Sequence, residues 1–400
     1  MAKEDIRRFI RLSEAPRGHR ESERLFRPTS RKLESARRIV VKIGSALIVD
    51  QATGRVREPW LEMLADDVAR LRGRGQDVAV VSSGAVAVGR YALDLHQKTL
   101  RKTEWQAAAA VGQIQLAKAY REAFARHRLT AAQILLTLDD TTEKKRMAGV
   151  RATLIRLLTL QAVPVVNEND AVARNIASFG DNDRLAARAA RLIEGDTLVL
   201  LSNVAGLYSA DPHESSSATL ITDVNNVTAE IEQMAGSARS GYSSGGMVTK
   251  LVAGKMALAS GCTMIIADGR DPYPLSAIDD GSQCTWFRPS TAARVARKTR
   301  IATTLRPLGA LVVDNAAVNQ LRSGEGLCIP EVRSFDGDFG RGDAIVIRDI
   351  CGHEVARGLS IYSSAEIRRI TRRSGLGTGW PLTAGSLDLI VHSDDLVLTD

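Results

Sequence analysis

The stretch "RIVVKIGSALIV", residues Arg38–Val49, predicts a buried β-strand that ends in a glycine turn. The segment "PWLEMLADDVARLRGRG" follows with helical periodicity, and "DVAVVSSGA" then predicts a second strand and turn. The alternation continues, with strands expected at "AAQILLT", "VPVVN", "TLVLLS" and "TMIIA" and helical patterns between them. Repeated strand–helix units predict an α/β fold: a doubly wound, mainly parallel sheet with helices on both faces.

Length and composition limit the class of protein. The chain has 400 residues, of which 44% are hydrophobic, enough for one large core and a second, smaller one. It contains no apolar run of the roughly 18 residues that a membrane helix needs, and no apolar signal segment at its start. We therefore expect a cytoplasmic protein with no membrane contact. The 4 cysteines are widely spaced without any CxxC pattern, which predicts reduced packing residues and no metal site.

The positive charge is concentrated at the N-terminus. The formal net charge is +8, and residues 1–38 alone hold 12 Lys/Arg against 6 Asp/Glu. Nucleic-acid binding would need such charge clustered on the folded domains. We therefore predict a basic and flexible N-terminal extension over residues 1–36, which makes nucleic-acid binding by the remainder less favourable.

The residues after each strand share one chemistry. In doubly wound sheets, ligands bind outside the carboxyl ends of the strands. Lys42 and Gly44 lie at the end of the first strand, Gly84 follows the second, and "SSGGMVTK" opens a helix that carries Lys250. Glycine turns and helix N-termini bind anions, and lysines add charge, so this set is typical of a phosphate site. The sequence GxxxxGK[ST] does not occur, which excludes a P-loop enzyme.

A second group of polar residues occurs in "VPVVNENDAVARNIASFGDND", residues 163–183. Asn167, Asn169 and Asp170 follow a predicted strand, and Asp181 and Asp183 stand at the start of a helix, where one of them could serve as the N-cap. Small side chains with donors and acceptors suit a substrate with both an ammonium and a carboxylate, such as an amino acid. An all-carboxylate metal site is the competing interpretation, and the interleaved carboxamides disfavour it.

Six motifs in order carry a resemblance to a known family. They are "VVKIGS", "SSGAVAVGR", "VPVVNENDAVA", "FGDND", "GLYSADP" and "GGMVTK". From about Arg38 onward the chain resembles the glutamate 5-kinase family, with an amino-acid-kinase domain and a small C-terminal PUA domain. We expect the kinase domain at residues 37–285, a basic connector at 286–304 and a β-rich PUA-like domain at 305–400.

The resemblance implies transfer of the ATP γ-phosphoryl group to the side-chain carboxylate of L-glutamate, the first step of proline synthesis. By motif position, it implies that Lys42 and Lys250 neutralise charge on the transferring group. Asp183 would orient these lysines, and backbone N–H groups of Gly44 and Gly84 would bind phosphoryl oxygens.

The resemblance also implies two binding surfaces. The glutamate pocket would comprise Ser83, Asn167, Asp170, Asp181 and Asn182. The nucleotide site would comprise Lys42, Ser202, Asn203, Ser244, Gly245, Gly246, Met247, Val248, Thr249 and Lys250. ATP would bind with Mg²⁺ held mainly through the phosphates.

Two departures from the family pattern lie on the nucleotide side. Asn203 stands where many relatives have Asp, which removes a carboxylate contact, and Ser243 and Ser244 replace the more usual Gly-Thr. Neither change touches the inferred glutamate pocket. The affinity for ATP is therefore the property that these changes would affect.

The family also implies regulation and partners. Proline would inhibit by competing for the glutamate pocket, and the chain would form a homo-oligomer, a dimer or a tetramer. The labile product suggests a functional link to γ-glutamyl phosphate reductase.

The C-terminal region reads as short strands and turns, typical of a compact β-rich module. PUA domains often occur in RNA-modifying enzymes, but residues 301–400 carry 10 arginines, no lysine and 13 acidic residues. This negative balance disfavours RNA binding and favours a structural or regulatory role. Any RNA contact would depend on residues 288–300 or on the cluster at 368–373.

Two alternative functions stay open at this point. Another kinase of the same fold would act on aspartate, N-acetylglutamate, carbamate or a nucleoside monophosphate, because fold alone does not define the substrate. A non-catalytic regulator that binds an amino acid or RNA is the second alternative, and the presence of both lysines and Asp183 disfavours it.

Overall fold

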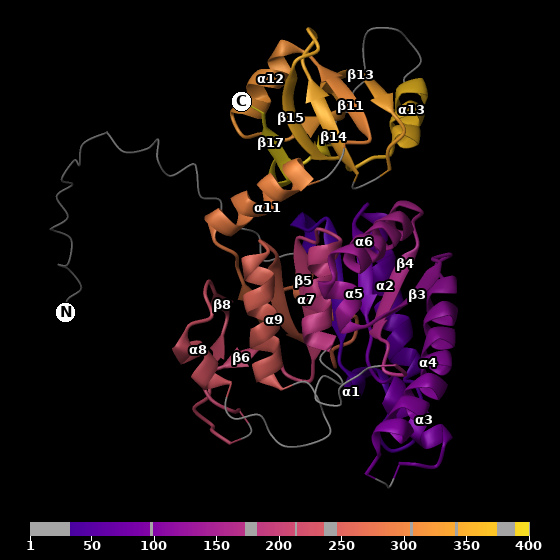
Figure 1. Ribbon diagram of the computed structural model, residues 1–400. Coiled ribbons are helices and arrows are strands. Elements are labelled where there is room, and N and C mark those ends of the chain that lie inside the picture. Colours follow the sequence, from indigo (N-terminus) through magenta and orange to yellow (C-terminus); the bar gives the residue numbers. More distant parts are fainter. Residues whose placement is uncertain are drawn as a thin grey trace, which may run out of the picture.

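The computed structural model describes residues 33–96, 99–172, 182–212, 214–235, 246–304, 307–340, 343–373 and 389–399. They form a large α/β domain and a smaller β-rich domain, joined by helix α11 (Thr291–Thr304) (Figure 1). No helix in these ranges is both long and apolar enough to cross a membrane.

The first domain is built on an eight-stranded sheet with the strand order β3-β4-β2-β1-β5-β9-β10-β8. All adjacent pairs in it run parallel except β9 and β10. This confirms the predicted doubly wound, mainly parallel sheet. Its strands are β1 (Arg38–Ile43), β2 (Asp77–Val81), β3 (Ala131–Leu136), β4 (Val163–Glu168), β5 (Thr197–Ser202), β8 (Asp223–Val224), β9 (Thr263–Asp268) and β10 (Cys284–Phe287).

Helices cover both faces of this sheet, and a small hairpin, β6 (Leu207–Tyr208) with β7 (Leu220–Ile221), lies beside it. The helices are α1 (Ser45–Ile48), α2 (Glu58–Gly73), α3 (Ala85–Ala92), α4 (Lys102–Ala125), α5 (Leu138–Thr142), α6 (Lys144–Thr159), α7 (Asn182–Leu192), α8 (Ala229–Met234), α9 (Met247–Ala259) and α10 (Pro274–Asp279).

The central strand β1 separates two hydrophobic cores. All six of its residues are buried, and their side chains alternate between the two faces of the sheet. Ile39, Val41 and Ile43 pack with α2, α4 and α10, whereas Val40 packs with α6, α7 and α9. Lys42 is two residues beyond Val40, so its side chain lies on the face that α7 and α9 cover.

Two glycines bring helices α3 and α4 into backbone contact. A Cβ atom on Gly89 would overlap the carbonyl oxygen of Ala108, and one on Gly112 would overlap that of Ala85. The close packing fixes the position of α3, whose first turn follows directly from Gly84. Glycine is required at Gly84 as well, because its φ is +100°.

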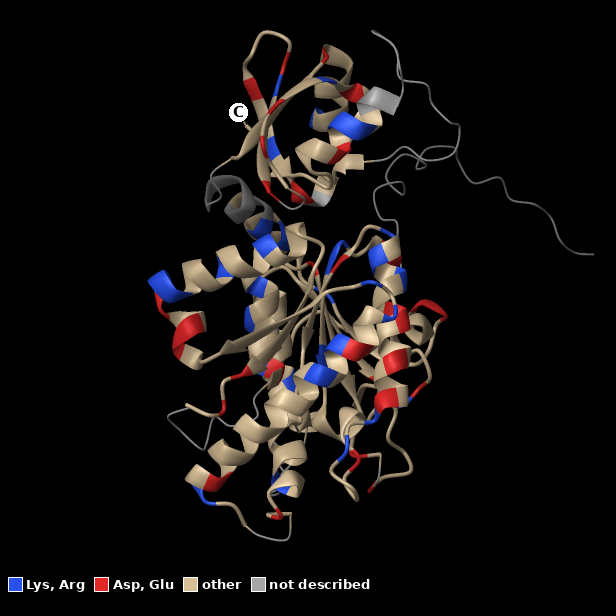
Figure 2. Cartoon of the chain, turned by 90° about the vertical axis from the view of Figure 1, so that its right-hand side faces the viewer, with Lys and Arg blue, Asp and Glu red and all other residues tan. Residues whose placement is uncertain are grey.

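The second domain has a five-stranded sheet with the order β13-β11-β14-β15-β17 and its own core. Its strands are β11 (Gly309–Val313), β13 (Val332–Gly337), β14 (Ala344–Arg348), β15 (Glu354–Leu359) and β17 (Leu396–Leu398). A pair of short strands, β12 (Leu327–Cys328) and β16 (Leu389–Val391), and two helices, α12 (Asn315–Arg322) and α13 (Ser364–Arg373), complete it. In the cartoon of Figure 2, acidic and basic residues are interspersed along the chain in both domains.

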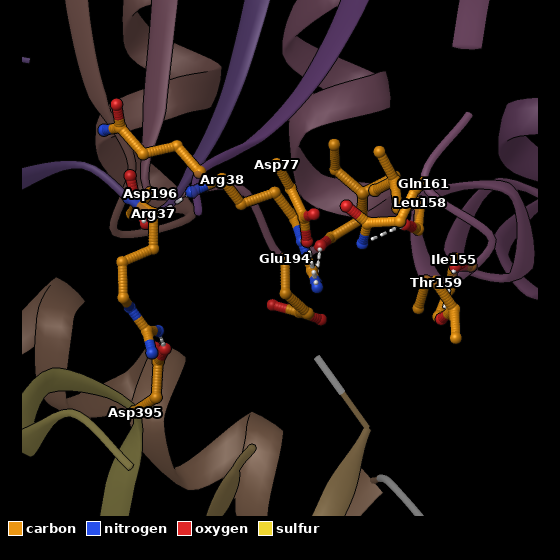
Figure 3. Close-up of polar contacts among 12 residues, drawn as sticks. Arg37, Arg38, Asp77, Ile155, Leu158, Thr159, Gln161, Glu194, Asp196 and Asp395 are labelled. Carbon is orange, nitrogen blue, oxygen red and sulfur yellow. Dashed lines mark hydrogen bonds and ion pairs between the residues drawn. The ribbon is translucent and has the colours of Figure 1, made fainter. Parts of the chain in front are cut away.

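The smaller domain lies against the amino ends of the sheet strands, at the opposite end from α1 and α3 (Figure 1). Asp395 is 1% exposed and forms ion pairs with Arg37 and with Arg297 of α11. Figure 3 shows Arg37 extending to Asp395 and Arg38 directed toward Asp77. A cavity of about 570 Å³ lies between the two domains, next to these contacts.

The structure differs from the prediction in two segments. Residues 33–36, predicted as part of a flexible extension, are packed: Leu33 is fully buried in a 3₁₀ turn, and Gln76 donates to its carbonyl. The rest of the predicted extension, residues 1–32, lies outside the described residues. The predicted connector is also structured, because β10 continues to Phe287 and α11 occupies most of the remainder. Helix α12 was missed in the sequence.

We predict that Gly112→Ala destabilises the protein by about 1–3 kcal/mol, because the new methyl group forces α3 away from α4. The same shift should lower catalytic turnover, since α3 begins at the cavity described below. Thermal unfolding and steady-state kinetics measure the two effects.

Gly149→Ala provides a matched control in the exposed part of helix α6. Nothing lies within 4 Å of the position of its added methyl group, so it should stabilise the protein by about 0.5–1 kcal/mol. Equal effects of the two substitutions would contradict the proposed packing role of Gly112.

Candidate active site

A cavity of about 230 Å³ opens at the carboxyl ends of the central strands. Its lining comes from the segments that follow β1, β2, β4 and β5, around the point where the strand order reverses direction from β1. It contains ten of the predicted site residues: Lys42, Gly44, Ser83, Gly84, Asn167, Asp170, Asn182, Ser202, Asn203 and Lys250.

A buried ion-pair cluster lies at the base of this cavity. Asp183 Oδ1 is 2.7 Å from Lys42 Nζ, and Asp183 Oδ2 is 3.3 Å from Lys250 Nζ. Thr249 donates a hydrogen bond of 2.8 Å to the same Oδ2. The three charged residues come from β1, α7 and α9, and none is more than 6% exposed.

The cluster carries an excess of positive charge. Burial alone would raise the pKa of Asp183, but the charges of Lys42 and Lys250 outweigh it and hold that pKa well below its usual range. Asp183 is therefore ionised and balances one of the two lysines. The two ammonium groups of this cluster outnumber its one carboxylate, which favours binding of an anion beside them.

The N-terminus of α3 adds to the anion site. Ala85, Val86 and Ala87, in the first turn of α3, line the cavity, where helical N–H groups have no intrahelical partner. At the turn after β1, the N–H of Gly44 donates to Leu201 O of β5 at 3.3 Å, so this N–H is already engaged within the sheet. Ser45, which the sequence reasoning did not select, begins the short helix α1 and also lines the cavity.

Asn182 is the centre of a hydrogen-bond network in the adjacent part of the cavity. Its Nδ2 donates to Ser82 O at 2.9 Å, to Ser83 Oγ at 2.8 Å and to Asn167 Oδ1 at 3.2 Å. Asn167 in turn donates to Gln113 Oε1 on α4 at 2.8 Å. The predicted pocket residues Ser83, Asn167 and Asn182 therefore form one connected group.

Asp170 contributes an unusual carboxylate to the cavity. Its Oδ1 is buried and has no hydrogen-bond partner among the described residues. Burial and the nearby charge of Glu168 raise the pKa of Asp170 to about 7. A buried acceptor without a partner is energetically unfavourable, and a bound cation would relieve it.

The nucleotide-side residues are less closely grouped. Ser202 is buried and donates to Asn203, which is exposed. Gly246, Met247, Val248 and Thr249 lie at the start of α9 but are not part of the cavity lining, although Thr249 contacts Asp183. Asp181, Ser244 and Gly245 lie outside the described residues.

Several site residues were missed in the sequence. Gln113 and Tyr120 lie on α4; Tyr120 is buried and donates to Ser82 Oγ at 3.0 Å. Arg90 and Trp105 also line the cavity. Trp105, Gln113 and Tyr120 lie within helix α4, at least 20 residues along the chain from the Gly84 turn, and no quoted motif includes them. Arg90 is the last residue of the motif "SSGAVAVGR", but the sequence reasoning gave it no role.

The arrangement can bind an anion next to a small polar molecule that carries a cationic group. The described lining of the cavity includes no histidine, and Asp183 is engaged with the lysines, so Asp170, with its raised pKa, is the described lining carboxylate that could accept a proton. Transfer of an anionic group to a nucleophile that is already ionised needs no base. The geometry is therefore suited to phosphoryl transfer by positioning and electrostatic stabilisation.

Comparisons with known proteins agree with this chemistry. Residues 37–268 match the model of the amino acid kinase family, and residues 309–376 match that of the PUA domain. The glutamate 5-kinase 1 of Rhizobium meliloti is 49% identical over 92% of this chain and 93% of its own length. The glutamate 5-kinase of Nitrobacter winogradskyi is 50% identical, over 92% and 97% respectively.

A solved UMP kinase from Bacillus anthracis aligns with 64% of this chain and 97% of its own, at 14% identity and a TM-score of 0.45. The family assignment depends on the first domain, where the matched model covers the whole lysine–aspartate cluster. The chain belongs to the amino acid kinase family and, within it, to the glutamate 5-kinases.

Proposed function

We propose that this protein transfers the γ-phosphoryl group of ATP to the side-chain carboxylate of L-glutamate, giving γ-glutamyl phosphate for proline synthesis. The observation that carries this proposal is the buried Lys42–Asp183–Lys250 cluster, together with Asp170 in the lining of the same cavity, whose Oδ1 has no hydrogen-bond partner among the described residues. The relatives named glutamate 5-kinase, at about half identity over most of the chain, support the choice of substrate.

The nucleophile in this reaction needs no activation by a base. A glutamate side chain has a reference pKa of about 4.3 and is ionised at neutral pH. The main barrier is the approach of one anion to another. Two fixed ammonium groups and the N-terminus of α3 lower that barrier, because they are positioned before the substrates bind.

Within this proposal, Lys42 and Lys250 neutralise the transferring phosphoryl group. Asp183 holds both ammonium groups in place by one ion pair from each of its oxygens. Gly84 allows the first turn of α3 to approach the phosphoryl oxygens. The N–H of Gly44 donates to Leu201 O of β5, so it is not directed to the phosphoryl group. In this proposal, Gly44 contributes only by forming the turn after β1.

The α-ammonium group of glutamate would bind to Asp170, whose Oδ1 accepts no hydrogen bond from the part of the chain that the structure describes. The Ser83, Asn167 and Asn182 network would bind the α-carboxylate and fix the direction of the side chain. Asp181 keeps its proposed place in this pocket from the family resemblance alone.

The nucleotide would bind beside Ser202, Asn203 and the start of α9, together with Ser244 and Gly245. Asp170 is the one carboxylate among the described lining residues, which fits a Mg²⁺ ion held mainly by the phosphates rather than by protein carboxylates. Ser202 and Asn203 offer oxygen atoms on that side. When bound, Mg²⁺ would reduce the negative charge of the phosphates.

Other family properties remain proposals for this chain. Proline would compete for the glutamate pocket, the protein would assemble as a dimer or tetramer, and a reductase would consume the labile product. We propose a cytoplasmic enzyme whose PUA-like domain has a structural or regulatory role rather than an RNA-binding one.

The direct test of the function is ATP-dependent acyl-phosphate formation, trapped with hydroxylamine, with glutamate, aspartate and N-acetylglutamate as acceptors. We expect product with glutamate alone. Product with another acceptor in place of glutamate would assign a different kinase activity, and no product with any acceptor would support a non-catalytic regulator.

We predict that Lys250→Ala lowers kcat by about 10²–10³-fold, by analogy with the loss of one preorganised donor. The fold should persist, because Asp183 keeps its ion pair with Lys42. Steady-state kinetics and circular dichroism measure the two properties. Lys255→Ala on the same helix is the matched control: Lys255 is 45% exposed, pairs with Glu232, and should leave kcat unchanged. A Lys250 variant with normal turnover would remove this residue from the mechanism.

We predict that the KM for glutamate falls as the pH rises through 7. The free protein binds a proton at Asp170, whose pKa is raised to about 7, and an ammonium group binds only to the ionised carboxylate. KM at about pH 6 should therefore be about tenfold higher than at about pH 8.

Two variants test the origin of this pH dependence. Asp170→Asn should raise KM and remove its dependence on pH, with a smaller effect on kcat. Glu168→Gln should shift the profile to lower pH, because the charge of Glu168 contributes to the raised pKa of Asp170. A wild-type profile that is flat over this range would contradict the assignment of Asp170 to the ammonium group.

A further inference from the structure

A tight turn in the PUA-like domain brings together three side chains of types that commonly serve as metal ligands. The turn "DICGH", Asp349–His353, connects β14 to β15 and lies outside the cavity of the kinase domain. Oxygen, sulfur and nitrogen atoms of Asp349, Cys351 and His353 all lie within 4.8 Å of one another. The kinase reaction gives these three residues no role.

The backbone of the turn holds the three residues on a short, closed loop. Asp349 N donates to His353 O, and Gly352 N donates to Asp349 O, each at 3.0 Å. Gly352 has a φ of +89°, which favours glycine. Asp349 Oδ1 accepts hydrogen bonds of 2.9 Å from the N–H groups of Cys351 and His353. The turn therefore keeps its shape without requiring the metal-binding atoms of Cys351 and His353.

We propose that this turn binds one divalent transition-metal ion, with zinc as the favoured ion, through Asp349, Cys351 and His353. Thiolate, imidazole and carboxylate are the ligands that zinc takes in proteins, and three protein ligands with one water complete a tetrahedral site. Calcium and magnesium are disfavoured, because they select oxygen ligands.

The distances require only a small contraction. Zinc bonds of about 2.0–2.3 Å place neighbouring tetrahedral ligand atoms about 3.3–3.8 Å apart. In the structure the three ligand atoms are up to 4.8 Å apart, about 1 Å more than this range. Rotation of the side chains can bring them closer by that amount. Cys351 is exposed and the His353 side chain is 79% exposed, so both can rotate and the ion can enter from solvent.

The contact between Asp349 and His353 already brings two of the proposed ligand atoms together. Asp349 Oδ2 lies 3.1 Å from His353 Nδ1, close to the separation of two ligand atoms on one zinc ion. On binding, a bond from each of these two atoms to the ion would replace the hydrogen bond between them.

The other cysteines allow a specific test. Cys262 and Cys284 are buried, and burial raises the pKa of the Cys262 thiol, which disfavours the thiolate form. Cys328 is partly exposed and lies in β12, so it is the accessible cysteine to compare with Cys351. A thiolate–metal signal from the folded protein should therefore depend on Cys351.

The experiment is a titration of the untagged, reduced full-length protein with Co²⁺ alone, followed by optical absorption. We expect one ion per chain and a thiolate-to-cobalt charge-transfer band, which Zn²⁺ then removes by displacement. Cys351→Ser should abolish the band, and Cys328→Ser, the matched control, should retain it. Circular dichroism checks that each variant is folded.

Two further variants test the other ligands. His353→Ala and Asp349→Asn should each weaken binding by at least about tenfold. The asparagine keeps an oxygen that accepts the two backbone N–H groups, so the turn should persist. No charge-transfer band in the wild-type protein, a band that survives Cys351→Ser, or a band lost in Cys328→Ser would each overturn the proposal. Kinase activity is not part of the readout, so failure here leaves the proposed reaction unaffected.

Discussion

The active site depends on burying two lysines against one aspartate. An isolated buried ammonium group is strongly unfavourable, and removal of one partner from a buried ion pair typically costs about 3–5 kcal/mol. Asp183 makes the burial of Lys42 and Lys250 possible, and it does so from the first turn of α7, where a carboxylate is favoured. Strand β1 and helix α9 must then both approach the first turn of α7, which constrains how the sheet and its helices pack.

Much of this arrangement follows from the sequence. The two-residue period of β1 places Lys42 on the same face as Val40, and glycine turns after two strands mark the anion site. The sequence alone does not show which helices pack together when their contacting residues belong to no recognisable motif. Gln113 enters the site because Gly112 lets α4 lie against α3, and that approach depends on atoms of Ala85 far along the chain. The packing of Leu33 and the engagement of the Gly44 N–H likewise depend on tertiary neighbours.

Two elements of the site extend to the interface with the second domain. Strand β1 has Lys42 near one end and Arg38 at the other, about 13 Å away at the rise of a strand. Helix α7 begins beside Asp183 and ends just before Glu194, whose carbonyl accepts a hydrogen bond from Arg297. Arg297 also pairs with Asp395 of the second domain. The domain interface therefore contacts the same two elements that carry Lys42 and Asp183.

Two parts of the cavity lining differ in charge. Among the described residues, the cluster at Asp183 has two ammonium groups and one carboxylate, and Asp170 has a carboxylate oxygen without a hydrogen-bond partner. A molecule with a carboxylate at one end and an ammonium at the other satisfies both only in one orientation. Reversal would place its ammonium beside the lysines and its carboxylate beside Asp170, and both contacts would be repulsive. Under the proposed assignment of Asp170 to the ammonium group, the charges would select direction as well as composition. They would then present the distal carboxylate of an amino acid, not its α-carboxylate, to the transferring phosphoryl group.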